Sequence, residues 1–165
     1  MRNFNFLILV GTAAAALVGC TKRAEFVKTS NQSATDAQGI VIVLPAGFEP
    51  RPKDNLYYHP RLRASISLNY GEGKHFDEVA AEFTKENLLT LGLEVDERVI
   101  LESDGRRTLY VQGRRLKGPY PQTCAITLFP TSRGCVQLAG TYPTDAAAEI
   151  GDAVRKSLIE ARFKE

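Results

Sequence analysis

The clearest pattern along the chain is a series of short stretches in which apolar and polar residues alternate. Residues 61–70 place leucine, alanine and isoleucine on one face and arginine and serine on the other, which predicts a strand with one buried face. Residues 40–44 (IVIVL) are apolar and mostly β-branched, and predict a strand that Pro45 ends. The proline-containing residues 46–60 predict a loop with a short strand at 56–58.

Four further stretches are expected to pair as two hairpins. They span residues 94–102, 107–115, 123–129 and 135–141. The first two flank Asp104-Gly105, and an Asp-Gly pair between strands is a strong hairpin signal. The second two flank the sequence PTSRG, with the turn expected at residues 130–133. Because hairpins are antiparallel, the sheet is expected to be antiparallel.

Two segments have the spacing of apolar positions that is typical of amphipathic helices. Residues 76–91 form the first, and Gly92 is well placed to end it. Residues 145–163 form the second, with Thr144 as its expected N-cap. Each helix has one apolar face that a sheet has to bury. The expected fold class is therefore α+β, an antiparallel sheet flanked by helices.

The first 19 residues have the features of an export signal. Arg2 provides a basic start, and residues 6–18 form a charge-free apolar run, shorter than the roughly 20 residues that span a bilayer. The run leads to Leu17-Val18-Gly19-Cys20, which resembles the lipobox of bacterial lipoprotein precursors. The resemblance implies that the chain is cut before Cys20 and that this cysteine carries acyl chains such as palmitate. Several acyl chains anchor a protein stably to a membrane.

The chain is expected to divide into a signal peptide, a tether and one domain. Residues 1–19 are the signal peptide, and residues 20–38 are a lipidated tether, since they are polar and lack an apolar period. Residues 39–165 form the domain. In enterobacteria, Asp after the lipidated cysteine retains a lipoprotein at the inner membrane. Here Thr21 follows, which favours the outer membrane, with the domain facing the periplasm.

The domain resembles the PsbP-like superfamily, which includes DcrB-like bacterial lipoproteins. The resemblance rests on residues 42–48 (IVLPAGF), on a first helix that ends at Leu91-Gly92, on the hairpins, and on a closing helix through Phe163. It implies an α/β/α sandwich around an antiparallel sheet, and binding of other proteins rather than catalysis. The superfamily has no common catalytic motif, so the resemblance assigns no functional residue.

Composition and charge argue against nucleic-acid binding, and the sequence contains no motif for a metal site or for catalysis. The formal net charge of +2, with 24% charged residues, does not suit nucleic-acid binding by bulk charge. The only histidines, His59 and His75, are expected at the surface or at a helix cap. No HExxH or CxxC motif is present, so no metal, cofactor or catalytic residue is expected.

Two cysteines remain after Cys20. In an oxidising periplasm, Cys124 and Cys135 are expected to form a disulfide. A symmetric turn at residues 130–133 would instead place Cys135 opposite Leu128, out of reach of Cys124. Two buried free thiols are therefore the alternative.

Two groups of charged residues are weak candidates for binding surfaces. The acidic group recurs every four residues of the first expected helix and comprises Glu78, Glu82 and Glu86. The basic group surrounds the first expected hairpin and comprises Arg106, Arg107, Arg114, Arg115 and Lys117. The alternatives are a solvated helix face and an ordinary charged sheet edge.

These features predict a membrane-anchored periplasmic lipoprotein that acts as a non-catalytic protein-binding or envelope-assembly module. The expected partners are the membrane, through the N-terminal lipid, and another envelope protein. A lipid-anchored inhibitor or immunity protein against a secreted toxin is an alternative, because such proteins are also small and lack catalytic motifs. An envelope hydrolase is a third possibility, and it would require a deep pocket with convergent polar residues.

Overall fold

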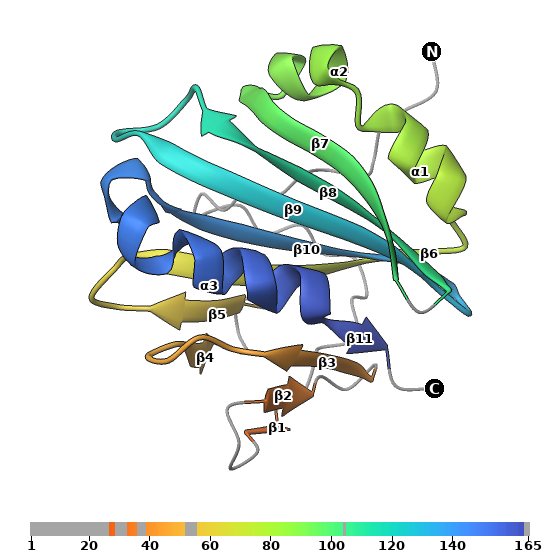
Figure 1. Ribbon diagram of the computed structural model, residues 1–165, viewed down its shortest axis with the longest axis horizontal. Helices are drawn as coiled ribbons and strands as arrows, with labels where there is room; N and C mark the ends of the chain where they lie inside the picture. The colour runs from red at the N-terminus through yellow and green to blue at the C-terminus, as the bar shows by residue number, and fades with distance from the viewer. Residues whose placement is uncertain (1–26, 29–32, 36–38, 52–55, 104, 164–165) are drawn as a thin grey trace, which may run out of the picture.

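A seven-stranded antiparallel sheet forms the centre of the fold (Figure 1). Across the sheet the strand order is β4-β5-β6-β10-β9-β8-β7. The sequence analysis predicted all of these strands except β4, which is three residues long and contains a proline. The bounds are β4 Glu49–Arg51, β5 Leu56–His59, β6 Ala64–Glu72, β7 Leu93–Ser103, β8 Arg106–Arg115, β9 Gln122–Thr131 and β10 Gly134–Pro143.

A smaller sheet, with strand order β1-β2-β3-β11, lies beside the first (Figure 1). Its strands are β1 Val27–Lys28, β2 Ser33–Thr35, β3 Ile40–Val43 and β11 Arg162–Phe163. Strands β1 and β2 fall in the expected tether, so folded structure begins before residue 39. Strand β11 falls in the expected closing helix, which ends earlier because Arg162 and Phe163 pair with β3.

The structure is a computed structural model, and it describes residues 27–28, 33–35, 39–51, 56–103 and 105–163. The expected signal peptide and Cys20 lie outside the described residues. Within the described ranges, no helix combines the length and apolar character that a membrane crossing requires.

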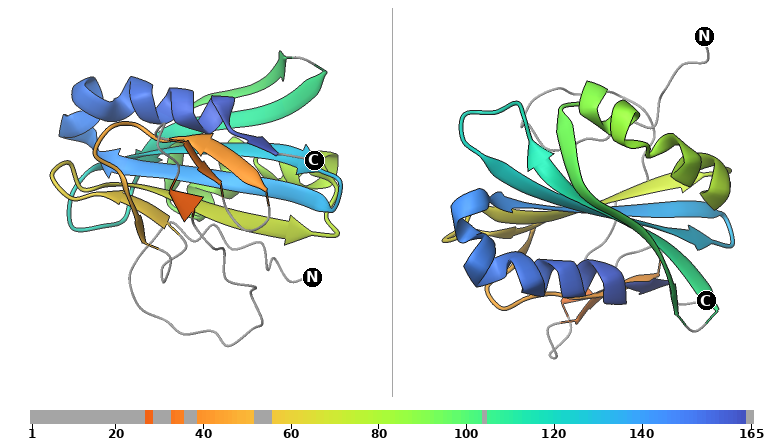
Figure 2. Two further views of the ribbon diagram at one scale, coloured as in Figure 1. Left: turned by 90° about the horizontal axis from the view of Figure 1, so that it is seen from below. Right: turned by 45° about the horizontal axis from the view of Figure 1, so that its top comes forward.

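Helix α3 (Ala147–Glu160) covers one face of the large sheet together with β3 (Figure 2). It buries Ile150, Val154 and Leu158 against β9 and β10. Gly140 of β10 makes the close approach possible, because a Cβ at that position would lie 2.5 Å from a methyl carbon of Val154. Thr144 does not cap this helix: it begins a 3-10 turn, Thr144–Ala146, that has no side-chain cap.

Two short helices, α1 (Phe76–Glu82) and α2 (Lys85–Thr90), cover part of the opposite face (Figure 2). The single helix predicted over residues 76–91 is therefore wrong. The helix breaks at Phe83, where ψ is 50°, and Thr84 starts the second helix by accepting a hydrogen bond from the backbone N–H of Asn87 (3.1 Å). The Asn87 side chain bonds the Glu82 carbonyl (2.9 Å) and stabilises the break. With helices on both faces, the expected α/β/α arrangement around an antiparallel sheet is confirmed.

Candidate binding cleft at one end of the sheet

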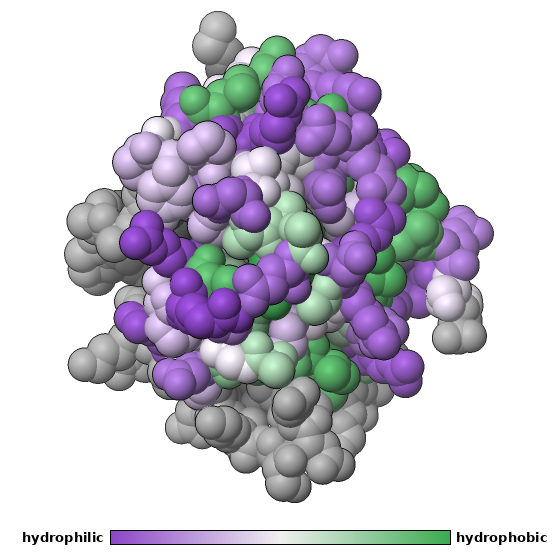
Figure 3. All heavy atoms as spheres, turned by 60° about the vertical axis from the view of Figure 1, so that its left-hand side comes forward, coloured by the Kyte–Doolittle hydropathy of each residue, from purple (hydrophilic) through white to green (hydrophobic). Residues whose placement is uncertain are grey.

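Three connections meet at one end of the large sheet and enclose a cleft of about 820 Å³. They are the β5–β6 turn (residues 60–63), the β8–β9 loop (residues 116–121) and the junction between β10 and α3 (residues 143–146). Figure 3 brings this end of the molecule forward, where hydrophilic and apolar side chains are mixed. Clefts of roughly 300–1,000 Å³ are typical of ligand sites, so this one is large enough to hold a few side chains of a partner.

Hydrogen bonds and an ion pair fix the walls of the cleft. The backbone N–H of Thr144 donates to the carbonyl of Pro121 (3.1 Å), which joins the β8–β9 loop to the start of α3. The hydroxyls of Thr144 and Thr123 are 3.4 Å apart and reinforce this contact. Arg61 of the β5–β6 turn forms an ion pair with Glu149 of α3. The three connections are therefore held relative to one another.

His59 supports the β5–β6 turn from inside. The prediction of a surface or capping histidine is wrong for this residue, which is buried. Its Nδ1 accepts a hydrogen bond from the backbone N–H of Leu62 (3.3 Å), and its ring packs edge-on against Phe48, with centroids 5.5 Å apart. Gly47 has no side chain to displace the imidazole, since a Cβ there would lie 2.5 Å from Nε2. His75 is exposed at the N-cap position of α1.

The cleft combines apolar surfaces with balanced charge. Leu62, Tyr120 and Pro121 are among its lining residues, and Tyr120 is 40% exposed. The charged lining residues are two arginines and two acids: Arg61, Arg63, Asp145 and Glu149. Tyrosine and arginine are enriched in protein interfaces, where they supply large contact areas together with polar groups.

Sequence patterns did not identify these residues. Arg61 and Arg63 were assigned to a strand because residues 61–70 alternate, yet β6 begins only at Ala64. One signal was present: Pro60, Pro121 and Pro143 lie in or beside all three connections that meet at the cleft. Loops at one end of a rigid sheet are common positions for binding residues.

The expected disulfide between Cys124 and Cys135 is not formed, and both residues are free buried thiols. The hairpin turn has only two residues between Thr131 and Gly134, so Cys135 pairs with Pro130. Cys124 lies six residues further along β9, about 20 Å away at strand spacing. Burial raises the pKa of Cys124 to about 12 and also raises the pKa of Cys135, so both thiols stay protonated at neutral pH.

Comparisons with known proteins identify the fold through solved structures. No protein-family model and no curated protein matches the chain. The solution structure of cyanobacterial PsbP (CyanoP) from Synechocystis sp. PCC 6803 superposes with a TM-score of 0.58 at 12% identity, over 91% of this chain and 98% of that one. The chain has a PsbP-like fold.

Two further structures share the PsbP-like fold. LpqN of Mycobacterium tuberculosis, described as involved in cell envelope biogenesis, has a TM-score of 0.59 at 16% identity over 76% of this chain and 83% of its own. The protein PA94 of Pseudomonas aeruginosa, described as a putative regulator of unknown function, has a TM-score of 0.51 at 13% identity over 87% and 99%. At such identities the similarity concerns the fold, so the functional residues have to be found in this chain's own geometry.

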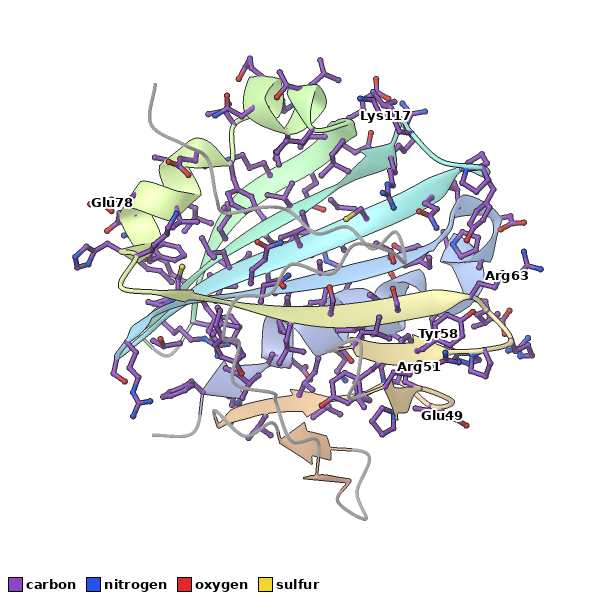
Figure 4. The ribbon with its side chains drawn as sticks, turned by 180° about the vertical axis from the view of Figure 1, so that it is seen from behind. Glu49, Arg51, Tyr58, Arg63, Glu78 and Lys117 are labelled. Atoms are coloured by element: carbon purple, nitrogen blue, oxygen red, sulfur yellow. The ribbon has the colours of Figure 1, made fainter. Side chains whose placement is uncertain are left out.

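The basic group does not form one patch on the PsbP-like domain. Arg106 and Arg107 lie at one end of β8, whereas Arg114 and Arg115 lie at the other, about 30 Å away at strand spacing. Lys117 follows in the β8–β9 loop, with its side chain over Gly92 (Figure 4).

Most of the basic group serves internal contacts. Arg107 pairs with Asp77 (2.7 Å), and Arg114 pairs with Glu94 (2.9 Å). Arg115 donates to the side chain of Gln122 (3.2 Å). These contacts fit the alternative of a charged sheet edge.

Arg106 lines a second groove, of about 860 Å³, at the C-terminal end of α3. Its guanidinium donates to the carbonyls of Ile159 (3.1 Å), in the last turn of α3, and of Ala161 (2.6 Å), which follows the helix. It also lies over the ring of Phe129 (5.6 Å). Arg106 therefore binds carbonyl groups that the end of a helix leaves unpaired.

The acidic group does not form one helix face either. Glu78 and Glu82 belong to α1, whereas Glu86 belongs to α2, beyond the break at Phe83. Glu78 is exposed at the far side of the molecule from the cleft (Figure 4). Among the described residues, no group of three or more histidine, cysteine or acidic side chains is arranged to hold a metal ion.

Proposed function

We propose that this protein is an envelope lipoprotein whose PsbP-like domain binds another envelope protein through the cleft, without catalysing a reaction. The apolar run at residues 6–18 and the motif ending at Cys20 support cleavage before Cys20 and acylation of its thiol. Thr21 after the cysteine favours the outer membrane over the inner membrane. The involvement of LpqN in cell envelope biogenesis is consistent with a role in the same compartment.

The lining of the cleft is the observation that carries this proposal. Its walls are braced by the Thr144–Pro121 hydrogen bond and the Arg61–Glu149 ion pair, so the surface is formed before a partner arrives. A preformed surface loses little conformational entropy on binding. Tyr120 offers a partly exposed ring beside proline and leucine, as interface residues often do.

The position of β1 limits where the partner can be. Only residues 20–26 separate the proposed lipid on Cys20 from the first strand, which begins at Val27. Seven residues reach at most about 24 Å when fully extended. A cleft on a domain held so near the bilayer suits a partner that is itself membrane-bound or membrane-proximal.

Crosslinking in cells tests this proposal. The full chain carries a C-terminal tag, and partners are captured after crosslinking from wild type, Tyr120→Ala and Cys20→Ala cells. We expect Tyr120→Ala to lose most of the captured partner, and Cys20→Ala to lose both the partner and the membrane fraction. Leu91→Ala is the matched control, because Leu91 is similarly exposed (51%) but does not line the cleft.

Different outcomes separate the proposal from its alternatives. Capture that is unchanged in Tyr120→Ala would remove the cleft as the binding site. A single tight partner with enzymatic activity would instead identify an inhibitor or immunity protein. Loss of a hydrolytic activity in the purified Tyr120→Ala protein, relative to wild type, would contradict a non-catalytic role.

A further inference from the structure

Arg63 has an unusual backbone conformation at the rim of the cleft. Its φ is +51°, and it is the one non-glycine residue with positive φ in the described part of the chain. The left-handed conformation is unfavourable for a residue with a Cβ, and glycine or asparagine usually adopts it. Arg63 closes the β5–β6 turn just before β6 begins at Ala64, so glycine would suit the turn better.

The Arg63 side chain has no structural role that accounts for this cost. Unlike Arg61, which pairs with Glu149, it makes no ion pair or hydrogen bond with the residues that the structure describes. The side chain is exposed and extends from the end of the turn (Figure 4). Strained residues that persist without a structural reason are often functional.

The other charges of the cleft limit what Arg63 can bind. Glu149 is neutralised by Arg61, and Asp145 lies in the 3-10 turn that leads into the N-terminus of α3, where a negative charge is favourable. Among the described lining residues, Arg63 is therefore the cation without an acidic partner. One arginine balances the charge of a single carboxylate, but not the higher charge of a phosphate group or an anionic lipid surface. A single carboxylate can take both donors of the planar guanidinium in a bidentate pair.

We propose that Arg63 determines the specificity of the cleft by binding a carboxylate in an acidic, extended peptide segment of the partner. This inference rests on the proposed function, and it names the chemistry of the partner. Residues next to the peptide carboxylate contact Tyr120 and Pro121, which provide flat, partly apolar surfaces beside the arginine. The left-handed backbone at Arg63 holds the guanidinium at the rim of the cleft, where the peptide segment of the partner can contact it.

Peptide selection tests this chemistry directly. The full chain in detergent micelles is immobilised by a C-terminal tag and used to select from a phage-displayed library of random 12-residue peptides. We expect the selected peptides to be enriched in Asp or Glu beside apolar residues, and to bind the immobilised Tyr120→Ala variant much more weakly than wild type. Failure to select peptides, or selection of peptides without an acidic residue, would overturn the proposal.

Substitutions of Arg63 separate its binding role from its backbone strain. We expect Arg63→Gln to weaken the selected peptides about 10-fold or more without raising Tm, because the charge is lost and the strain stays. Arg63→Gly is expected to weaken them equally while raising Tm by roughly 3 °C, because glycine accepts positive φ. Arg133→Gln is the control, since Arg133 is an exposed arginine in the β9–β10 turn, outside the cleft. Unchanged affinity in Arg63→Gln would refute the role of Arg63.

The same variants distinguish this inference from the proposed function. If crosslinked capture in cells is lost with Tyr120→Ala but retained with Arg63→Gln, the cleft binds a partner and the inference about Arg63 is wrong. If both variants retain capture, the proposed function is wrong as well. Selected peptides that bind equally well when their acidic residues are replaced by amides would also count against a carboxylate contact.

Discussion

Arg155 of α3 and Glu97 of β7 form a bidentate ion pair, with Nη1–Oε2 and Nη2–Oε1 distances of 2.6 and 2.9 Å. The Arg155 guanidinium also lies 4.4 Å from the centre of the Tyr110 ring. This contact ties the helix on one face of the sheet to its edge strand, which α3 does not otherwise cover extensively. It is the only bidentate ion pair among the described residues.

Removing this contact is expected to destabilise the domain measurably. Arg155→Ala should lower the free energy of unfolding by about 1 kcal/mol, because both a bidentate pair and a cation–π contact are lost from a partly exposed site. Lys156→Ala is a matched control on the same helix, since the Lys156–Glu160 pair is longer (4.0 Å) and more exposed. Urea denaturation monitored by circular dichroism gives both values. Equal decreases in the free energy of unfolding in the two variants would show that the Arg155–Glu97 pair stabilises the domain no more than the Lys156–Glu160 pair.

The same pair should make stability depend on pH. Hydrogen bonds from Arg155 hold the pKa of Glu97 below its ordinary value of 4.5. A carboxylate with a lowered pKa in the folded state stabilises the protein above its unfolded pKa, and this stabilisation disappears as the pH falls through the folded value. The difference in urea midpoint between wild type and Glu97→Gln should therefore be largest at pH 7 and become smaller below pH 4.5. A difference that stays constant well into the acid range would contradict this assignment.

Packing of α3 on β10 supplies a third prediction. A Cβ at Gly140 would lie 2.5 Å from Cγ1 of Val154, so Gly140→Ala is expected to cost about 1–3 kcal/mol through overpacking. Val154→Ala removes the clashing methyl group and costs stability by itself. In the double variant the two costs should not add, because the new methyl group occupies part of the vacated space. Additive costs in urea denaturation would show that the helix shifts away instead of clashing.

The sequence predicted much of the sheet because its signals are local. An alternation of two residues reports one buried face wherever a strand lies, and it located the cores of β6 to β10 from residues 61–70 onward. The break between α1 and α2 was missed because the apolar spacing continues through it. Thr84, with its side-chain cap, decides the break, and a threonine within an otherwise helical pattern is a weak signal.

The cleft could not be predicted because it depends on distant connections. The β5–β6 turn, the β8–β9 loop and the start of α3 are far apart in sequence, and only the strand order of the sheet brings them together. The registers of both hairpins also had to be known. A turn of two residues rather than four, at Ser132-Arg133, moved the partner of Cys135 from Leu128 to Pro130, two positions further from Cys124. Neither register brings the two cysteines within disulfide reach, so the alternative of two buried free thiols is the one that the structure has.

The two buried thiols lead to a prediction about reactivity. Because burial raises the pKa of Cys124 to about 12, the thiolate that reacts with maleimide or iodoacetamide is scarce in the folded state. Cys135, also buried, bonds the Gly71 carbonyl (4.0 Å) and should be protected as well. We expect no labelling of either residue in the native protein and labelling of both in guanidinium chloride without a reductant. A mass two hydrogens lower, together with no labelling after denaturation, would demonstrate a disulfide instead.

Acylation of Cys20 is the prediction on which the placement of the domain at a membrane depends. Cells that express the full chain and are fed a clickable palmitate analogue should incorporate it into wild type but not into Cys20→Ala, because the thiol is the acyl acceptor. Cys124→Ala is the control for labelling at another cysteine, since that thiol is buried and protonated. Wild type and Cys124→Ala should both fractionate with membranes, whereas Cys20→Ala should not, because that variant lacks the several acyl chains that make anchoring stable. An intact mass that includes Met1 would contradict cleavage before Cys20, and palmitate label that persists in Cys20→Ala would contradict acylation of that thiol.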